Sequence, residues 1–259
     1  PSQLVALPYH GLSDEILAQI FEELHSSYQE GSRVHVPPPQ YLLVSKRLHN
    51  IARPIWLSVI SVQGTLAATN RFLAKLLTDP TIRNFVRGLG IKFFRSFTQS
   101  QFAILTVLDN LRRLTVHLDD SGSRRLNAKK SLPPMLLEPI ANCPRLEELS
   151  FSQLVEVHSR IPQPVNKRPL QSFTAPVHSI NKALLEYLTV RRVKKLRLTV
   201  FLNHEPFTGD LPWDHLTTIV FDIALLQDND QGITWSVPDT LARQVRVNRV
   251  SRIFRLPLI

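Results

Sequence analysis

The stretch CPRLEELSF, residues 143–151, contains the pattern that decides the fold: apolar side chains at Leu146, Leu149 and Phe151. The same apolar-x-x-apolar-x-apolar pattern occurs in seven copies along the chain. Their first apolar residues are Leu57, Val86, Leu111, Leu146, Leu170, Val193 and Leu216. Alternation over the last positions of each copy is typical of a short strand with one buried face. Each copy therefore predicts a strand.

Helical patterns separate the predicted strands, at 69–78, 100–111, 133–143 and 180–190. Successive copies begin 29, 25, 35, 24, 23 and 23 residues apart, and the longest spacing contains a polar insertion at 119–131. One strand and one helix every 20–29 residues or so form the unit of a leucine-rich-repeat solenoid, in which neighbouring units bury each other's apolar faces. The sequence thus predicts an α/β fold with a curved parallel sheet over residues 57–259. CPRLEELSF itself resembles the repeats of F-box leucine-rich-repeat proteins.

The segment LSDEILAQIFEEL (12–24) predicts a helix with a well-marked start. Ser13 suits the N-cap because its hydroxyl can accept a hydrogen bond from a backbone N–H. Asp14 and Glu15 then stand in the first turn, where the helix dipole favours negative charge. The helix has an apolar arc of roughly 140°, which is wide for a contact within one small unit. The arc consists of Ile16, Leu17, Ile20, Phe21 and Leu24.

A second helix is predicted over YLLVSKRLHNIARPIW (41–56), after a loop at 25–40 that contains three consecutive prolines. Pro54 is expected to end this helix or to follow its end. The two segments together resemble the F-box, particularly that of fungal F-box proteins. The residues that match are Leu12, Glu15, Ile16, Leu17, Ile20, Phe21, Leu24, Leu43, Val44, Ser45, Lys46, Arg47, Ile51, Ala52 and Trp56. Ser13 and Leu48 stand where the pattern usually has proline and tryptophan.

The resemblance implies an all-α F-box-like module at residues 1–56, followed by the repeat domain at 57–259. In the family, this module binds a Skp-family adaptor and, through it, the cullin of an SCF-type cullin–RING ubiquitin ligase. The chain would then be the substrate receptor of the ligase, which holds a target protein for ubiquitin-dependent degradation. The expected adaptor-binding residues are Leu12, Ser13, Glu15, Ile16, Ile20, Phe21, Leu43, Val44, Lys46 and Arg47.

The charge of the chain is unevenly placed. The formal net charge is +10, and residues 1–32 contribute −5, so the remaining residues carry +15. Such asymmetry indicates two surfaces with different partners. A basic cluster at the sixth copy is the candidate target-binding site and is compatible with an acidic target. It consists of Arg191, Arg192, Lys194, Lys195 and Arg197.

Two alternatives remain open at this point. In the first, the amino-terminal helices only cap the repeats, and the chain is a protein-interaction scaffold outside a ligase. That interpretation requires Ile16, Ile20 and Phe21 to be buried by residues of the same chain. In the second, the basic body binds nucleic acid or another anionic surface, although the basic clusters lack the interleaved aromatic residues that stack on bases.

The composition also excludes several kinds of site. The sequence has no glycine-rich phosphate cradle and no HExxH motif, and Cys143 is its single cysteine, so a multi-cysteine zinc site is excluded. We therefore expect no enzyme activity, no cofactor, no metal and no small-molecule substrate. No apolar run is long enough to span a bilayer, and no signal peptide is recognisable. A cytoplasmic or nuclear protein without a membrane partner is expected.

Overall fold

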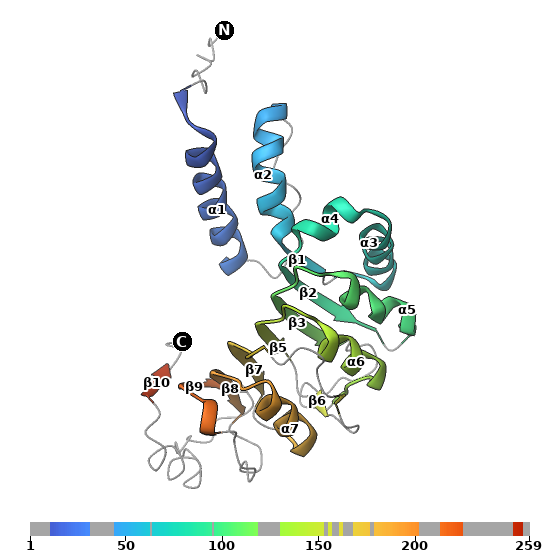
Figure 1. The fold of residues 1–259 in the computed structure, drawn as a ribbon, viewed down its shortest axis with the longest axis vertical. Coiled ribbons are helices and arrows are strands. Elements are labelled where there is room, and N and C mark those ends of the chain that lie inside the picture. The colour runs from blue at the N-terminus through green and yellow to red at the C-terminus, as the bar shows by residue number, and fades with distance from the viewer. Residues whose placement is uncertain are drawn as a thin grey trace, which may run out of the picture.

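The computed structural model describes residues 11–31, 44–62, 64–94, 96–118, 130–152, 155–156, 161–162, 168–176, 179–201, 213–224 and 251–255. Two helices lead into a sheet that has further helices along one side (Figure 1). The prediction of a mixed α/β chain is confirmed.

Eight parallel strands form the main sheet, and they follow one another across it in chain order. They are β1 (Val59–Val62), β2 (Gly88–Phe93), β3 (Arg113–Leu118), β5 (Glu148–Phe151), β7 (Ser172–Pro176), β8 (Lys195–Phe201), β9 (Thr218–Ala224) and β10 (Ser251–Arg255). The first seven coincide with the seven copies of the apolar pattern. A small second sheet pairs β4 (Lys130–Ser131) with β6 (Val155–Glu156).

The strand register aligns the middle apolar residue of each copy with that of the next. This line consists of Ile60, Leu89, Leu114, Leu149, Phe173, Leu196 and Ile219. These side chains belong to one continuous hydrophobic core. Because successive side chains of a strand point to opposite faces, the residues on either side of each middle position form the other face of the sheet. We call that other face the open face.

The described helices after β1 cover the buried face, and Figure 1 shows α3, α5, α6 and α7 along the same side of the sheet. They are α3 (Leu66–Thr78), α4 (Pro80–Phe85), α5 (Gln99–Phe102), α6 (Pro134–Asn142) and α7 (Lys182–Val190), with 3-10 turns η3 (Ala103–Val107) and η5 (Trp213–His215). Capping side chains start several of them: Thr65 accepts from the amide of Ala68, and Asn181 accepts from that of Leu184. The single helix predicted over 100–111 is instead the short α5 followed by η3.

Backbone hydrogen bonds also join the turns that lead into neighbouring strands. The carbonyl of Arg87 accepts from the amides of Arg112 and Arg113, and the carbonyl of Arg112 accepts from Glu147 and Glu148. These bonds extend the ladder of the parallel sheet one residue beyond each strand, so they hold the successive strands in register.

Arg191, directly after α7, is only 1% exposed. Its guanidinium donates to the carbonyls of Leu146 and Arg168, at 2.5 and 3.0 Å, and to the hydroxyl of Tyr187 at 3.2 Å. The side chain thus links the turn before β5 to the turn before β7 by hydrogen bonds. The prediction that Arg191 belongs to a target-binding surface is wrong, because carbonyl oxygens of the interior already use its donors.

The helices α1 (Asp14–Gly31) and α2 (Lys46–Ser58) lie side by side, with their amino termini together (Figure 1). Ser13 lies at the N-cap as predicted, with its hydroxyl 3.4 Å from the amide of Ile16. Arg47 donates to the Asp14 carboxylate, at 2.7 to 2.8 Å, and to the carbonyl of Leu12 at 2.7 Å. These bonds fix the start of α2 against the start of α1.

Two expectations about these helices are wrong. α1 continues to Gly31 instead of ending near residue 24, because the polar residues after Leu24 contain no proline until Pro37. Pro54 lies inside α2, which continues to Ser58. The proline removes one backbone hydrogen bond of α2. The helix nevertheless continues, and beyond the proline the ring of Trp56 packs edge-on against His25 of α1, with ring centroids 4.7 Å apart. The expected module boundary at residue 56 thus falls in the last turn of α2.

Candidate functional site

Four exposed apolar side chains form a line on α1 and the residues just before it. They are Leu12, Ile16, Ile20 and Leu24, whose exposed fractions are 38, 45, 40 and 38%. A spacing of four residues places side chains above one another on the same face of a helix. We call this line the α1 stripe. Val44, just before α2, is also exposed, at 68%.

The opposite side of the apolar arc is buried against α2. Leu17 and Phe21 pack with Leu48 and Ala52 in a small core separate from that of the sheet. Phe21 is 5% exposed, which corrects the prediction that it contacts an adaptor. Because a helix turns about 100° per residue, Phe21 points into the interior of the pair while its neighbour Ile20 points outward.

Negatively charged side chains occupy the other exposed side of α1, next to the α1 stripe. Glu15, Glu22 and Glu23 are exposed. The pKa of Glu15 lies below its usual value because its carboxylate accepts a hydrogen bond from its own backbone amide and a second from the Ser13 hydroxyl. This part of the surface therefore combines an apolar line with negative charge at neutral pH.

The remaining predicted adaptor residues have different positions. Lys46 is exposed at the first turn of α2. Arg47 is also exposed, yet its guanidinium is bound to Asp14 and Leu12, so its visible role is to join the two helices. Leu43 lies outside the described residues, as does most of the proline-bearing loop.

His25 is buried between the two helices, beside Trp56. Burial lowers the pKa of its imidazole below the usual 6.5, because desolvation disfavours the charged form. The helix pair is therefore most stable when His25 is neutral.

We expect the Tm of the chain to fall as the pH decreases through about 6.5, since the unfolded chain then binds a proton that folded His25 does not. His25→Gln should reduce the decrease in Tm between pH 7.5 and 5.5. The pKa of His117 is also lowered, by burial and by the charge of Lys92. His117 therefore contributes the same decrease in Tm to the unaltered chain and to His25→Gln. Equal decreases in the two proteins would contradict a role for His25.

The predicted basic cluster is divided by the fold. Lys195 and Arg197 are exposed at open-face positions of β8, between the buried Leu196 and Leu198. Arg192 and Lys194 are exposed in the turn before β8, where Arg192 has a φ of 47°. That conformation ends α7, with the amide of Val193 bonded to the carbonyl of Leu188. Four of the five predicted residues therefore remain at the surface.

Sequence analysis missed a feature of the open face, a recess over β2. The open-face positions of β2 hold Gly88 and Gly90, so two side chains are missing where each neighbouring strand has them. The signal was present in the sequence, because GLG places glycines on both sides of Leu89. The recess has a volume of about 290 Å³ and extends from Val59 of β1 to Ser172 of β7.

The reactive side chains of the described residues indicate structural roles. Cys143 is fully buried, and burial raises the pKa of its thiol to about 12, so it stays protonated at neutral pH. Among the described residues, no group of histidine, cysteine and carboxylate side chains is placed to hold a metal ion. No described helix combines the length and apolar character needed to cross a membrane.

Comparison with known proteins gives no match. No family model matches the chain, and neither a curated protein nor a solved structure is similar to it.

Proposed function

We propose that the chain is the substrate receptor of an SCF-type cullin–RING ubiquitin ligase. In this proposal the α1 stripe binds a Skp-family adaptor and the repeat domain binds a target protein. The observation that carries the proposal is the exposure of Ile16 and Ile20, at 45 and 40%, on a helix that already buries Leu17 and Phe21 against α2.

The form of this surface suits a partner helix. Apolar anchors four residues apart on one helix face are the pattern by which amphipathic helices dock. Exposed carboxylates beside the α1 stripe would attract a partner with basic residues near its apolar contact and speed its association. The same residues carry the resemblance to the F-box, so chemistry and motif support the same partner.

The arrangement of the sheet supports the second half of the proposal. Parallel strands in chain order, each aligned with the next at the same apolar position, are what a leucine-rich-repeat solenoid requires. We therefore assign β1, β2, β3, β5, β7, β8 and β9 to seven degenerate repeats. The repeats pack their middle apolar residues under the helices and, except at β2 with its two glycines, leave two side chains on the open face for a target.

The proposed mechanism is proximity without chemistry. A receptor that holds both an adaptor and a target raises the effective concentration of target lysines near a separate ubiquitin-conjugating enzyme. The alternative, in which α1 and α2 only cap the repeats, requires Ile16 and Ile20 to be buried by the chain itself. Their exposure favours the receptor over that alternative.

The double variant Ile16→Asp/Ile20→Asp tests the proposal. Carboxylates in place of two central apolar anchors should weaken capture of a purified Skp-family adaptor by about thirtyfold or more. Both side chains are already exposed, so the Tm should change little. The matched control is Leu77→Asp, which places a carboxylate at an apolar α3 residue that is 44% exposed. It should capture the adaptor as the unaltered chain does.

Equal capture by the unaltered chain and by the double variant would reject the adaptor site. Loss of capture by Leu77→Asp as well would show that the effect is not specific to the α1 stripe and would remove the support that the double variant gives to the proposal.

A further inference from the structure

The floor of the recess on the open face consists of two glycines that the local backbone conformation does not require. Gly88 and Gly90 lie in a regular strand, and neither has the left-handed φ that favours glycine. Glycine weakens a strand and often marks a place where a ligand or another backbone comes close. A Cβ at Gly88 would meet the Val59 side chain at 3.0 Å, so packing accounts for that glycine, whereas a Cβ at Gly90 would meet the Ser61 hydroxyl at 3.2 Å and the Ser61 Cβ at 3.6 Å. Packing within the sheet therefore gives little reason for a glycine at position 90, whereas a need for space above the strand does give a reason.

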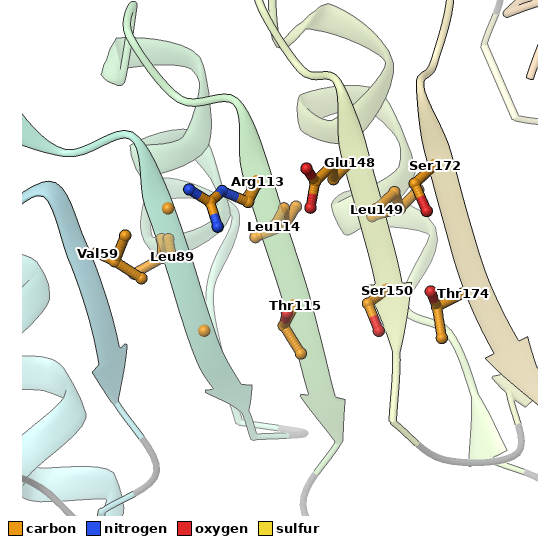
Figure 2. Close-up of a pocket in the computed structure, with 12 residues that line it drawn as sticks. Val59, Leu89, Arg113, Leu114, Thr115, Glu148, Leu149, Ser150, Ser172 and Thr174 are labelled. Atoms are coloured by element: carbon orange, nitrogen blue, oxygen red, sulfur yellow. The ribbon is translucent and has the colours of Figure 1, made fainter. Parts of the chain in front are cut away.

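The polar groups around the floor are not used within the described structure. Arg113 and Glu148 stand side by side in the register of β3 and β5, yet they form no ion pair. Neither makes a side-chain hydrogen bond to any described residue, nor do the hydroxyls of Thr115 and Ser150. One residue earlier, by contrast, Arg112 pairs with Glu147 at 3.7 Å. Figure 2 shows the Arg113 side chain pointing away from Glu148, toward the strand of Leu89.

The charge and composition of the open face define what it can bind. At the two open-face positions of each strand from β1 to β8, the cations Arg113, Lys195 and Arg197 outnumber the single anion, Glu148. The same positions carry no aromatic side chain, so bases of a nucleic acid have no stacking partner there. Hydroxyls of serine and threonine fill most of the rest and can donate to or accept from a peptide backbone.

We propose that this recess binds an extended acidic segment of a target protein, with a carboxylate of the segment paired to Arg113 above the two glycines. Arginine binds carboxylates through two parallel hydrogen bonds. Strands lie about 4.8 Å apart, so a segment that crosses from β2 to β7 needs about four extended residues. Glu148 and the nearby hydroxyls would accept from and donate to its backbone. The proposal rests on the proposed function only in taking a target protein as the source of the segment.

The test uses the full chain without any adaptor. The probe is an array of heptapeptides in which each glutamate-containing sequence stands beside its Glu→Gln version, and the strongest pair is then measured in solution by fluorescence anisotropy. We expect the Glu peptide to bind about tenfold more tightly than the Gln peptide. Arg113→Gln should abolish that preference. The control Lys75→Gln removes one positive charge from an exposed position of α3, on the helix side of the sheet, and should preserve the preference.

A second variant fills the space and leaves every charge in place. Gly90→Val should weaken binding of both peptides, and its circular dichroism and Tm show whether the strand still forms. If the strand does not form in Gly90→Val, Gly90→Ala replaces it as the variant that fills the space.

Four results would overturn the proposal: no binder on the array, no preference for Glu over Gln, equal loss of preference in Arg113→Gln and Lys75→Gln, or tighter binding of single-stranded RNA than of any peptide. Adaptor capture by the unaltered chain is measured in parallel. If capture fails while the Glu preference holds, only the ligase function is rejected. If capture holds while the preference fails, only the recess is rejected.

Discussion

Arg191→Ala is expected to lower the free energy of unfolding by roughly 3–5 kcal/mol, because it removes three buried hydrogen bonds together with the packing of a large buried side chain. The guanidinium is 1% exposed and bonds to two backbone carbonyls and the Tyr187 hydroxyl. Its loss takes one donor from each of three acceptors, at about 1–3 kcal/mol for each bond that water cannot replace, and adds a cavity. The gain from no longer burying a charge offsets part of this loss.

Two further variants separate geometry from charge. Arg191→Lys keeps the positive charge, but a single ammonium cannot reproduce the planar fork that spans Leu146 and Arg168. It should therefore recover less than half of the loss. Arg192→Ala, at the exposed neighbouring position, should change the stability by less than about 1 kcal/mol. Urea unfolding followed by circular dichroism measures all three.

A different outcome would support the prediction from sequence that Arg191 belongs to a target-binding surface. If Arg191→Ala unfolded at the same urea concentration as the unaltered chain and only lost binding to a target, Arg191 would belong to a binding surface after all. The burial of Tyr187 offers a second readout. Burial raises the pKa of its hydroxyl to about 12 while the Arg191 guanidinium lowers it, so loss of the guanidinium without a change in burial would raise that pKa further.

The seven strands could be predicted because their signal is local and repeated. Each copy alternates apolar and polar residues within six positions, and the even spacing distinguishes the copies from chance. β10 was not predicted because it lacks this pattern. Its register places Arg252 opposite Ile219, where every earlier strand has an apolar residue. The pattern alone cannot identify a strand that lacks the pattern.

The burial of individual residues depended on distant parts of the chain. Arg191 stands in the basic run RRVKKLR, which locally indicates a solvent-exposed surface. Its acceptors come from residues 23 and 45 positions earlier, and nothing near it in sequence announces them. The apolar arc of α1 likewise showed that one side must be buried, but the side was decided by the position of α2 across a long loop.

Phe21→Ala is the second variant with a large expected effect, because it acts on a core of only four buried residues. Truncating a buried phenylalanine costs about 3–5 kcal/mol, which is comparable to the whole stability of many small folded units. We expect α1 to separate from α2. Hydrogen exchange should then show faster exchange in α1 and α2 and unchanged protection in β2 to β8, which belong to the other core.

The adjacent variant Ile20→Ala gives the matching comparison, since the two residues are neighbours whose side chains point about 100° apart around one helix. Ile20 is 40% exposed, so its truncation should leave exchange in both helices unchanged and still weaken adaptor capture. Phe21→Ala should weaken capture only together with the loss of protection, because a detached α1 no longer presents its stripe in a fixed orientation. If Phe21→Ala instead kept full protection and lost capture, Phe21 would touch the adaptor directly, and the packing of α1 on α2 described above would have to be revised.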